Sequence, residues 1–208
     1  MGNMLRATVT IEGTRPLFFH KFGRDAIPLE KQERTGVAGN DPETWRKTTD
    51  VTQNGQLRVD GSYAFATIRN GGRFTKKGTR GTLQGPIEAT LQIEDDRILV
   101  DRYFPGFPNG HAFDIKTAEV PSEEPEEPIY LDVRGTVQPK TRARNVTYRI
   151  VASPGWHMTF HLLWDKTIVS RAEMEAVLID AGKLVGIGNA RKIGMGRFNI
   201  TQFDVEEA

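Results

Sequence analysis

The hydrophobic and polar positions along the chain predict several strands and two helices. From Leu5 to Ile11 every second residue is apolar and the residues between are polar, which is typical of a strand with one buried face. The same alternation returns between Trp156 and Leu162. Two further runs are expected to form a hairpin around the acidic residues 94–96. Strands are thus predicted at residues 5–11, 87–93, 97–104, 129–137, 146–151 and 156–164, and from about Phe198 onward.

Two capping signals mark the helices. Ser170 and Glu173 have the spacing of a capping box, in which each residue bonds the backbone of the other. The apolar residues that follow recur on one helix face: Met174, Val177, Leu178 and Ala181. A shorter helix is expected over residues 61–74, with Ser62 as its N-cap and the glycine pair beginning at Gly71 as its end.

The elements follow the order strand, helix, strands, helix, strand. This is the α+β plan of the ferredoxin-like fold, βαββαβ, which also underlies the RNA-recognition motif. We expect one domain over residues 1–208 with three insertions. They are a long loop without a clear period at 14–57, an acidic proline-rich linker at 105–128 and a basic β-hairpin at 129–151. Many activities use this fold, so the fold alone identifies no function.

Composition excludes several classes of protein. With 208 residues and 38% hydrophobic side chains, the chain is long enough for a core and is not disordered throughout. Cysteine is absent, which excludes a disulfide framework, a thiol nucleophile and a zinc–thiolate site. No apolar run approaches the roughly 20 residues of a membrane helix, and the first ten residues lack the layout of a signal peptide. A cytoplasmic protein without a membrane partner is therefore expected.

The net charge is only +1, but the charges are segregated along the chain. Residues 61–87, 133–164 and 181–203 contain half of the 28 Lys and Arg and none of the 27 Asp and Glu. Such segregation indicates a positive face for a polyanion, separate from a negative one. The alternative is a set of scattered, solvated loops.

The strongest local motif is a glycine-rich segment at residues 184–198, between the second helix and the last strand. Glycine lets a backbone approach a phosphate closely and point its N–H groups at it, and interleaved cations add attraction. The alternative is a glycine-rich turn that only lets helix and strand pack. The spacing is neither a dinucleotide fingerprint nor a Walker loop. Its glycines and cations are Gly186, Gly188, Gly194, Gly196, Arg191, Lys192 and Arg197.

The pattern G-x-G-x5-G-x-G after the second helix resembles the repeat-associated mysterious protein (RAMP) superfamily, the RNA-binding subunits of CRISPR effector complexes. A second segment, from Arg58 to Ser62 and into a helix containing Arg69, is similar to the element after the first strand in their backbone subunits. Asp60 stands where that family usually has proline, and Tyr63 where it has a small polar residue.

The resemblance implies a non-catalytic RNA-binding backbone subunit of a CRISPR-type ribonucleoprotein effector. Such subunits polymerise as a helical filament along a single-stranded guide RNA, with copies of themselves and other effector subunits as partners. An inserted thumb hairpin kinks the RNA, a role that falls here on residues 134–149, although an ordinary solvated hairpin is the alternative. The implied nucleic-acid-binding residues are His20, Lys21, Ser62, Arg69, Arg73, Lys76, Lys77, Arg134, Lys140, Arg142, Arg144, Gly186, Gly188, Asn189, Arg191, Lys192, Gly194, Gly196 and Arg197.

Catalysis has only weak candidates, and no cofactor or metal is expected. Some relatives cut RNA with an Asp of the loop after the first strand, where Asp25 lies, and processing ribonucleases use a His, for which His20 is the candidate. His157 and His161 would lie about 13 Å apart on a strand, too far to share a metal. Three alternatives remain: a guide-processing endoribonuclease using His20, a mobile-element protein that binds single-stranded DNA, and a purely structural assembly protein that binds neither nucleic acid.

Aromatic residues in the predicted insertions have two interpretations each. Phe18, Phe19 and Phe22 flank His20 and either stack on bases or close the core. Trp45 and the cluster of phenylalanines at residues 104–113 lie in irregular stretches, where they are candidates for packing against a partner.

Overall fold

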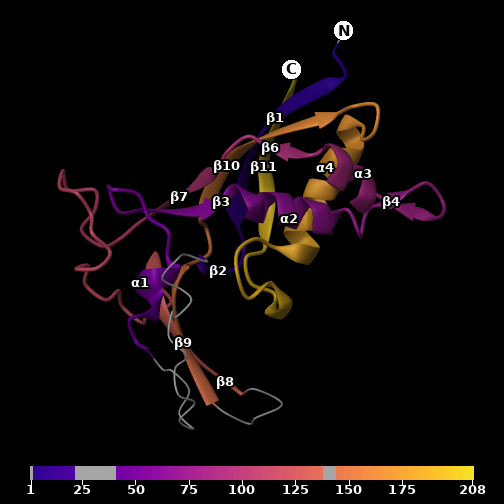
Figure 1. Ribbon diagram of the computed structural model, residues 1–208. Coiled ribbons are helices and arrows are strands. Elements are labelled where there is room, and N and C mark those ends of the chain that lie inside the picture. The colour runs from indigo at the N-terminus through magenta and orange to yellow at the C-terminus, as the bar shows by residue number, and fades with distance from the viewer. Residues whose placement is uncertain (1, 22–40, 138–143) are drawn as a thin grey trace, which may run out of the picture. The chain divides into compact units, whose positions relative to one another are not determined.

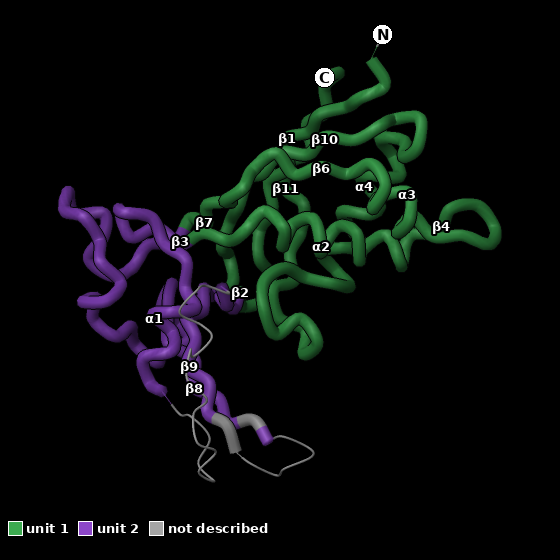
Figure 2. Tube along the Cα trace, viewed as in Figure 1, with its two compact units in different colours: residues 1–17, 58–101, 154–208 green, residues 18–57, 102–153 purple. Residues whose placement is uncertain are grey.

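A computed structural model describes residues 2–21, 41–137 and 144–208 of the chain (Figure 1). The chain divides into two compact units (Figure 2). Unit 1 comprises Met1–Leu17, Arg58–Asp101 and Pro154–Ala208, and unit 2 comprises Phe18–Leu57 and Arg102–Ser153. Unit 2 consists almost entirely of the segments that the sequence predicts as insertions. The candidate residues Asp25, Lys140 and Arg142 lie outside the described residues.

Unit 1 is built on an antiparallel sheet in the order β11-β1-β10-β7-β3, with β6 paired to β10. The strands are β1 (Met4–Gly13), β3 (Gln56–Asp60), β6 (Gln92–Ile93), β7 (Arg97–Tyr103), β10 (His157–Asp165) and β11 (Phe198–Glu207). The alternation in the sequence is confirmed, because Ala7, Val9 and Ile11 are buried while the residues between them are not. With two long helices between its strands, this α+β unit is compatible with a ferredoxin-like core.

The helices α2 (Gly61–Gly71) and α4 (Arg171–Asp180) pack against one another in unit 1, and a turn of π-helix, η2 (Ala181–Val185), continues α4 (Figure 1). The capping box of α4 is confirmed: Ser170 accepts a hydrogen bond from the N–H of Glu173, whose carboxylate accepts one in return. In α2 the predicted N-cap was wrong by two residues. Asp60 caps the helix, accepting from the N–H of Ser62 at 2.9 Å.

This cap supports a paired prediction. Replacing Asp60 with Ala is expected to lower the free energy of unfolding by about 1 kcal/mol, because an N–H in the first turn of α2 loses its acceptor. Replacing Ser62 with Ala should lower it by only about 0.5 kcal/mol, because it removes an exposed hydroxyl that bonds the Asp60 carboxylate and leaves the capped N–H in place. Urea unfolding of the two variants measures both values. A Ser62→Ala loss equal to that of Asp60→Ala would contradict the assignment of the cap.

The predicted hairpin at residues 87–93 and 97–104 was also partly wrong. Its first half is mostly the helix α3 (Gln84–Thr90), while β6 and β7 each pair with β10 rather than with one another. The physical reason is the spacing of the buried Leu83, Ile87 and Leu91, which recur every four residues and bury one helix face.

Unit 2 contains a small sheet in the order β2-β9-β8, formed by β2 (Leu17–Phe18), β8 (Ile129–Val137) and β9 (Arg144–Ala152). The predicted pair of strands is therefore confirmed, with Ile129 opposite Ala152 and Val137 opposite Arg144. The predicted long loop contributes a short helix, α1 (Thr44–Thr48), which buries Trp45 completely. Residues 105–128 contain no helix or strand, as the sequence predicts.

Candidate nucleic-acid interface

The glycine-rich segment lies against helix α2 within unit 1. The hydroxyl of Thr67, buried on α2, donates to the carbonyl of Gly186 at 3.0 Å. A Cβ at Gly71 would lie 2.7 Å from the Cβ of Ala181, so α2 and η2 are in close contact there. Thr67 was not among the predicted residues, although a polar residue on the buried face of an amphipathic helix is a recognisable signal.

Gly186 and Gly196 bring the two ends of this loop together. Both have positive φ, 81° and 67°, and a Cβ on Gly196 would overlap the carbonyl oxygen of Ile187. The N–H of Ile187 donates to the carbonyl of Gly196, and the N–H of Gly196 donates to that of Pro16, both at 2.8 Å. These two glycines thus have a packing role.

The loop contains basic side chains, and no acidic residue lies close to them in the sequence. Arg191 and Lys192 lie in a 3-10 turn that ends at Ile193, whose apolar side chain is 62% exposed. The Nη1 atom of Arg197 is buried and has no hydrogen-bond acceptor among the described residues. Burial lowers the pKa of Arg197, which still leaves a charged guanidinium at neutral pH.

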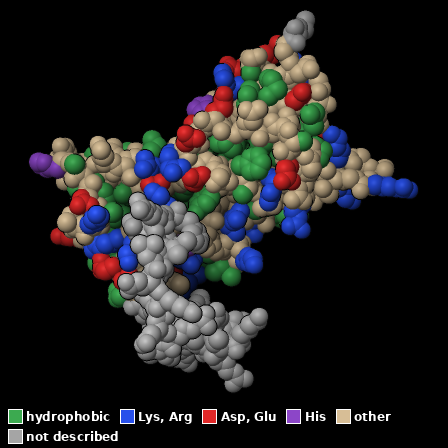
Figure 3. Space-filling model, in the orientation of Figure 1, with side chains coloured by type: hydrophobic (Ala, Val, Ile, Leu, Met, Phe, Trp, Pro, Cys, Tyr) green, Lys and Arg blue, Asp and Glu red, His purple; other side chains and the backbone are tan. Residues whose placement is uncertain are grey.

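Tyr63 of α2 lies near this loop. Burial and the charge of Asp60 raise the pKa of its phenol, while Arg191 acts in the opposite direction. The side of α2 that bears Tyr63 and Thr67 therefore borders the glycine loop. Figure 3 shows Lys and Arg side chains on the lower part of unit 1, around the position of this loop in Figure 1.

Other residues of unit 1 that were predicted to bind nucleic acid have surroundings that are less favourable for a phosphate. Ser62 lines a hollow together with three acids, Asp60, Asp95 and Asp96, and one cation, Arg97, and this excess of acids would repel a phosphate. Arg69 pairs with Glu88 of α3 at 3.3 Å. Arg73, just after α2, is exposed.

Lys76 and Lys77 form β4, which pairs with β5 (Gly81–Thr82) in a hairpin that projects away from the glycine loop (Figure 1). The ammonium of Lys77 donates to the carbonyl of Ile168 at 2.7 Å, while Lys76 is exposed. This hairpin is a second basic feature of unit 1, separate from the loop.

The solvent-facing side of the central sheet is poorly suited to nucleic acid. An RNA-recognition motif stacks bases on aromatic residues of this face. On β11, β1 and β10 the outward residues include no Phe, Tyr or Trp, and the two histidines among them are paired with carboxylates: Arg6, Thr8, Thr10, Glu12, His157, Thr159, His161, Leu163, Asn199, Gln202, Asp204 and Glu206. His157 and His161 pair with Asp101 and Asp95 at 3.0 and 3.2 Å. Single strands are thus not expected to stack here.

Within unit 2 the predicted contacts lie on or beside the β8–β9 hairpin. The guanidinium of Arg134 lies 4.6 Å above the ring of Phe18 and pairs with Asp132 at 2.7 Å. Lys21 pairs with the buried Asp50 at 3.2 Å. The backbone of Arg144 belongs to β9, but its side chain lies outside the described part of the chain. Phe18 and Phe19 are buried, so these two rings close the core rather than stack on bases.

His20 is half-buried in unit 2. Burial lowers the pKa of its imidazole below the usual 6.5, and the charge of Arg149 lowers it further, so the ring is neutral at pH 7. Because the unfolded chain takes up the proton more readily, His20 contributes its full stability above pH 6.5 and loses it as the pH falls below that value. The free energy of unfolding should therefore fall more steeply from pH 7 to pH 5 in the wild type than in His20→Gln. If the free energy of unfolding, measured by urea titration, falls equally with pH in the two proteins, the burial of His20 is contradicted.

No group of three or more His, Asp or Glu residues able to hold a metal occurs in the part of the chain that the structure describes. Likewise, none of the described helices is long and apolar enough to cross a membrane.

Comparison with known proteins finds similarity in structure rather than in sequence. No protein-family model matches the chain, and no curated protein matches its sequence. Among solved structures, the fold is similar to that of a chain in the cryo-EM structure of the type III-B Cmr-beta complex bound to cognate target RNA. The TM-score is 0.50 at 10% sequence identity, over 98% of this chain and 61% of the other. The two chains share a fold, and the present chain spans about three-fifths of the other's length.

Proposed function

We propose that this chain is a non-catalytic RNA-binding subunit of a CRISPR-type ribonucleoprotein effector, of the RAMP superfamily. It binds single-stranded RNA through phosphate contacts and without marked sequence preference. The observation that carries the proposal is the glycine loop, in which Arg191, Lys192 and Arg197 occur with no acid between residues 181 and 203.

The fold similarity supports the proposal from a second direction. The similar chain belongs to a type III-B complex bound to cognate target RNA. This likeness supports a CRISPR effector role for the present chain. The polar outward face of the sheet is also consistent with the proposal. Because that face is poorly suited to stacking bases, the side of unit 1 with the glycine loop and α2 is the better place for basic contacts with RNA. We further propose that copies of the chain stack head to tail along the RNA, as a heterologous contact permits.

The test uses a 30-nucleotide uridine RNA, its thymidine DNA counterpart and the purified protein. We expect salt-dependent binding of the RNA, with the logarithm of the affinity falling linearly with the logarithm of the salt concentration. Preference for the DNA strand would select the alternative of a mobile-element protein. Absence of salt-dependent binding to either strand would refute the proposal.

The endoribonuclease alternative has one observation in its favour, the neutral His20, because a neutral imidazole accepts a proton. If His20 is catalytic, His20→Ala abolishes cleavage of a guide precursor and leaves binding unchanged. If the chain is non-catalytic, the wild type leaves the RNA intact.

A further inference from the structure

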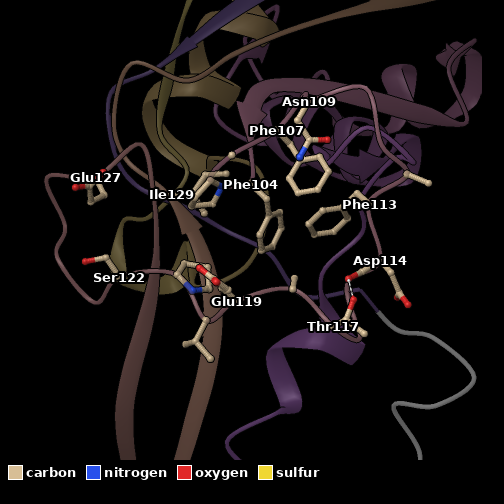
Figure 4. Close-up of a pocket in the computed structure, with 16 residues that line it drawn as sticks. Phe104, Phe107, Asn109, Phe113, Asp114, Thr117, Glu119, Ser122, Glu127 and Ile129 are labelled. Atoms are coloured by element: carbon tan, nitrogen blue, oxygen red, sulfur yellow. Dashed lines mark hydrogen bonds between the residues drawn. The ribbon is translucent and has the colours of Figure 1, made fainter.

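A cavity of about 660 Å³ lies within unit 2, in the segment between β7 and β8 (Figure 4). Its apolar wall contains three phenylalanine rings, from Phe104, Phe107 and Phe113. Three acidic residues also line it, Asp114, Glu119 and Glu127, and each of them is exposed. Among the described residues that line it there is no Lys or Arg. Aromatic faces beside unneutralised carboxylates form the environment that attracts an organic cation.

The rings of this cavity are fixed against one another. Phe107 meets Phe113 edge to face, with ring centres 5.0 Å apart and planes at 87°. Phe113 in turn lies 4.8 Å from Phe104, which stacks on the buried Trp45 at 6.0 Å. The wall therefore keeps its shape although its segment contains no helix or strand.

The backbone of the same segment is held by specific hydrogen bonds. The N–H of Phe113 donates to the carbonyl of Gln53 at 2.7 Å. The Nη1 atom of Arg46 donates to the carbonyls of Ile115 and Ala118, at 2.5 and 2.8 Å. The guanidinium of Arg46 also lies 4.2 Å above the ring of Trp45. Unit 2 thus already contains one guanidinium held on an aromatic face, behind the cavity wall.

We propose that this cavity, which we call the acidic aromatic pocket, binds an arginine side chain presented by another protein chain. Charge complementarity identifies the occupant: residues 105–128 contain six acids and a single lysine. A guanidinium fits better than an ammonium, because it is planar, weakly hydrated and able to stack on rings while pairing with carboxylates. This proposal is independent of RNA binding, which rests on unit 1.

The test measures peptide binding by calorimetry in the absence of nucleic acid, with the full chain. The probe is a capped pentapeptide with two arginines between glycines, and its control replaces each arginine by citrulline, which has nearly the same shape and no charge. We expect the arginine peptide to bind at least tenfold more tightly than the citrulline peptide. Phe107→Leu, which removes a π face but keeps an apolar side chain, should weaken binding several-fold.

The chain offers a matched control for the carboxylates. The pocket variant replaces Asp114 with Asn and both Glu119 and Glu127 with Gln, and is expected to weaken peptide binding at least tenfold. The control variant replaces the exposed Glu123, Glu124 and Glu126 with Gln, which removes the same charge from the same segment outside the pocket. It should change binding less than twofold. Thermal unfolding of each variant verifies that the fold is retained.

Three results would overturn the proposal. Undetectable binding of the arginine peptide, or equal binding of the citrulline peptide, would show that the pocket does not bind a guanidinium. Equal losses in the two triple variants show that the segment attracts cations only through its overall charge. Displacement of the peptide by equimolar spermidine assigns the pocket to a free polyamine instead of a protein chain. Failure of RNA binding in the separate titration affects only the proposed function.

Discussion

Replacing Arg191, Lys192 and Arg197 together with Ala is expected to lower the affinity for single-stranded RNA on the order of 100-fold at ~0.1 M salt. Under the proposed function each of these cations contacts a phosphate, and the three residues lie on a single loop of unit 1. When RNA binds, each cation also displaces counterions from the strand. Without the three cations the slope of log affinity against log salt should therefore become shallower by about 2 units, at ~0.7 per cation for a single strand.

A control triple removes the same charge from another part of unit 1. Arg6 and Lys166 pair with Glu94 and Glu207, at 2.9 and 2.8 Å, and Arg97 pairs with Asp60. Neutralising these three with Ala should lower RNA affinity only a few-fold, because none of them belongs to the glycine loop. Fluorescence anisotropy over a salt series distinguishes the sets. If both triple variants lose the same RNA affinity and have the same salt slope, the glycine loop is not a specific RNA-binding site and only net charge attracts the RNA.

The second large effect concerns stability. Replacing Gly196 with Ala is expected to lower the free energy of unfolding by about 3–4 kcal/mol, from left-handed strain of ~1–2 kcal/mol plus the loss of two backbone hydrogen bonds. The added Cβ would overlap the carbonyl oxygen of Ile187, which is backbone and has no rotamer in which to escape. The chain would have to move, breaking the bonds that join Gly196 to Ile187 and Pro16.

Gly194 provides the comparison, because it lies in the same loop with φ of 83° but has no atom within 4 Å of an added Cβ. Gly194→Ala should therefore lose only the left-handed strain, ~1–2 kcal/mol. Urea unfolding of both variants separates the close approach from the strain. If Gly194→Ala loses as much as Gly196→Ala, the packing of the loop ends is not what makes Gly196 necessary.

Much of unit 1 follows from local sequence. The alternation in β1 and the capping box of α4 depend on side chains within a few residues of one another, and both are found as predicted. The N-cap of α2 was misplaced because Asp60 and Ser62 are both good capping residues, and only the backbone conformation chooses between them: Asp60 is extended, while Ser62 is already helical.

The surroundings of three residues became visible only once distant segments were brought together. The resemblance implies that Ser62 contacts RNA, and the turn between β6 and β7 brings Asp95 and Asp96 beside it. His157 and His161 have carboxylate partners from other segments, Asp101 and Asp95. Sequence spacing cannot reveal such neighbours, since they depend on which strands pair.

Periodicity, capping and local charge are properties of neighbouring residues. They suffice to predict the α+β composition of the chain, its longest strands, the capped helix α4 and the acid-free glycine loop. The packing role of Gly186 and Gly196, the unsatisfied donor of Arg197, and the cavity lined by three phenylalanines and three acidic residues become visible only in the folded chain. Each of these depends on which atoms of distant segments come within a few ångströms, and that is settled by the packing of the whole unit.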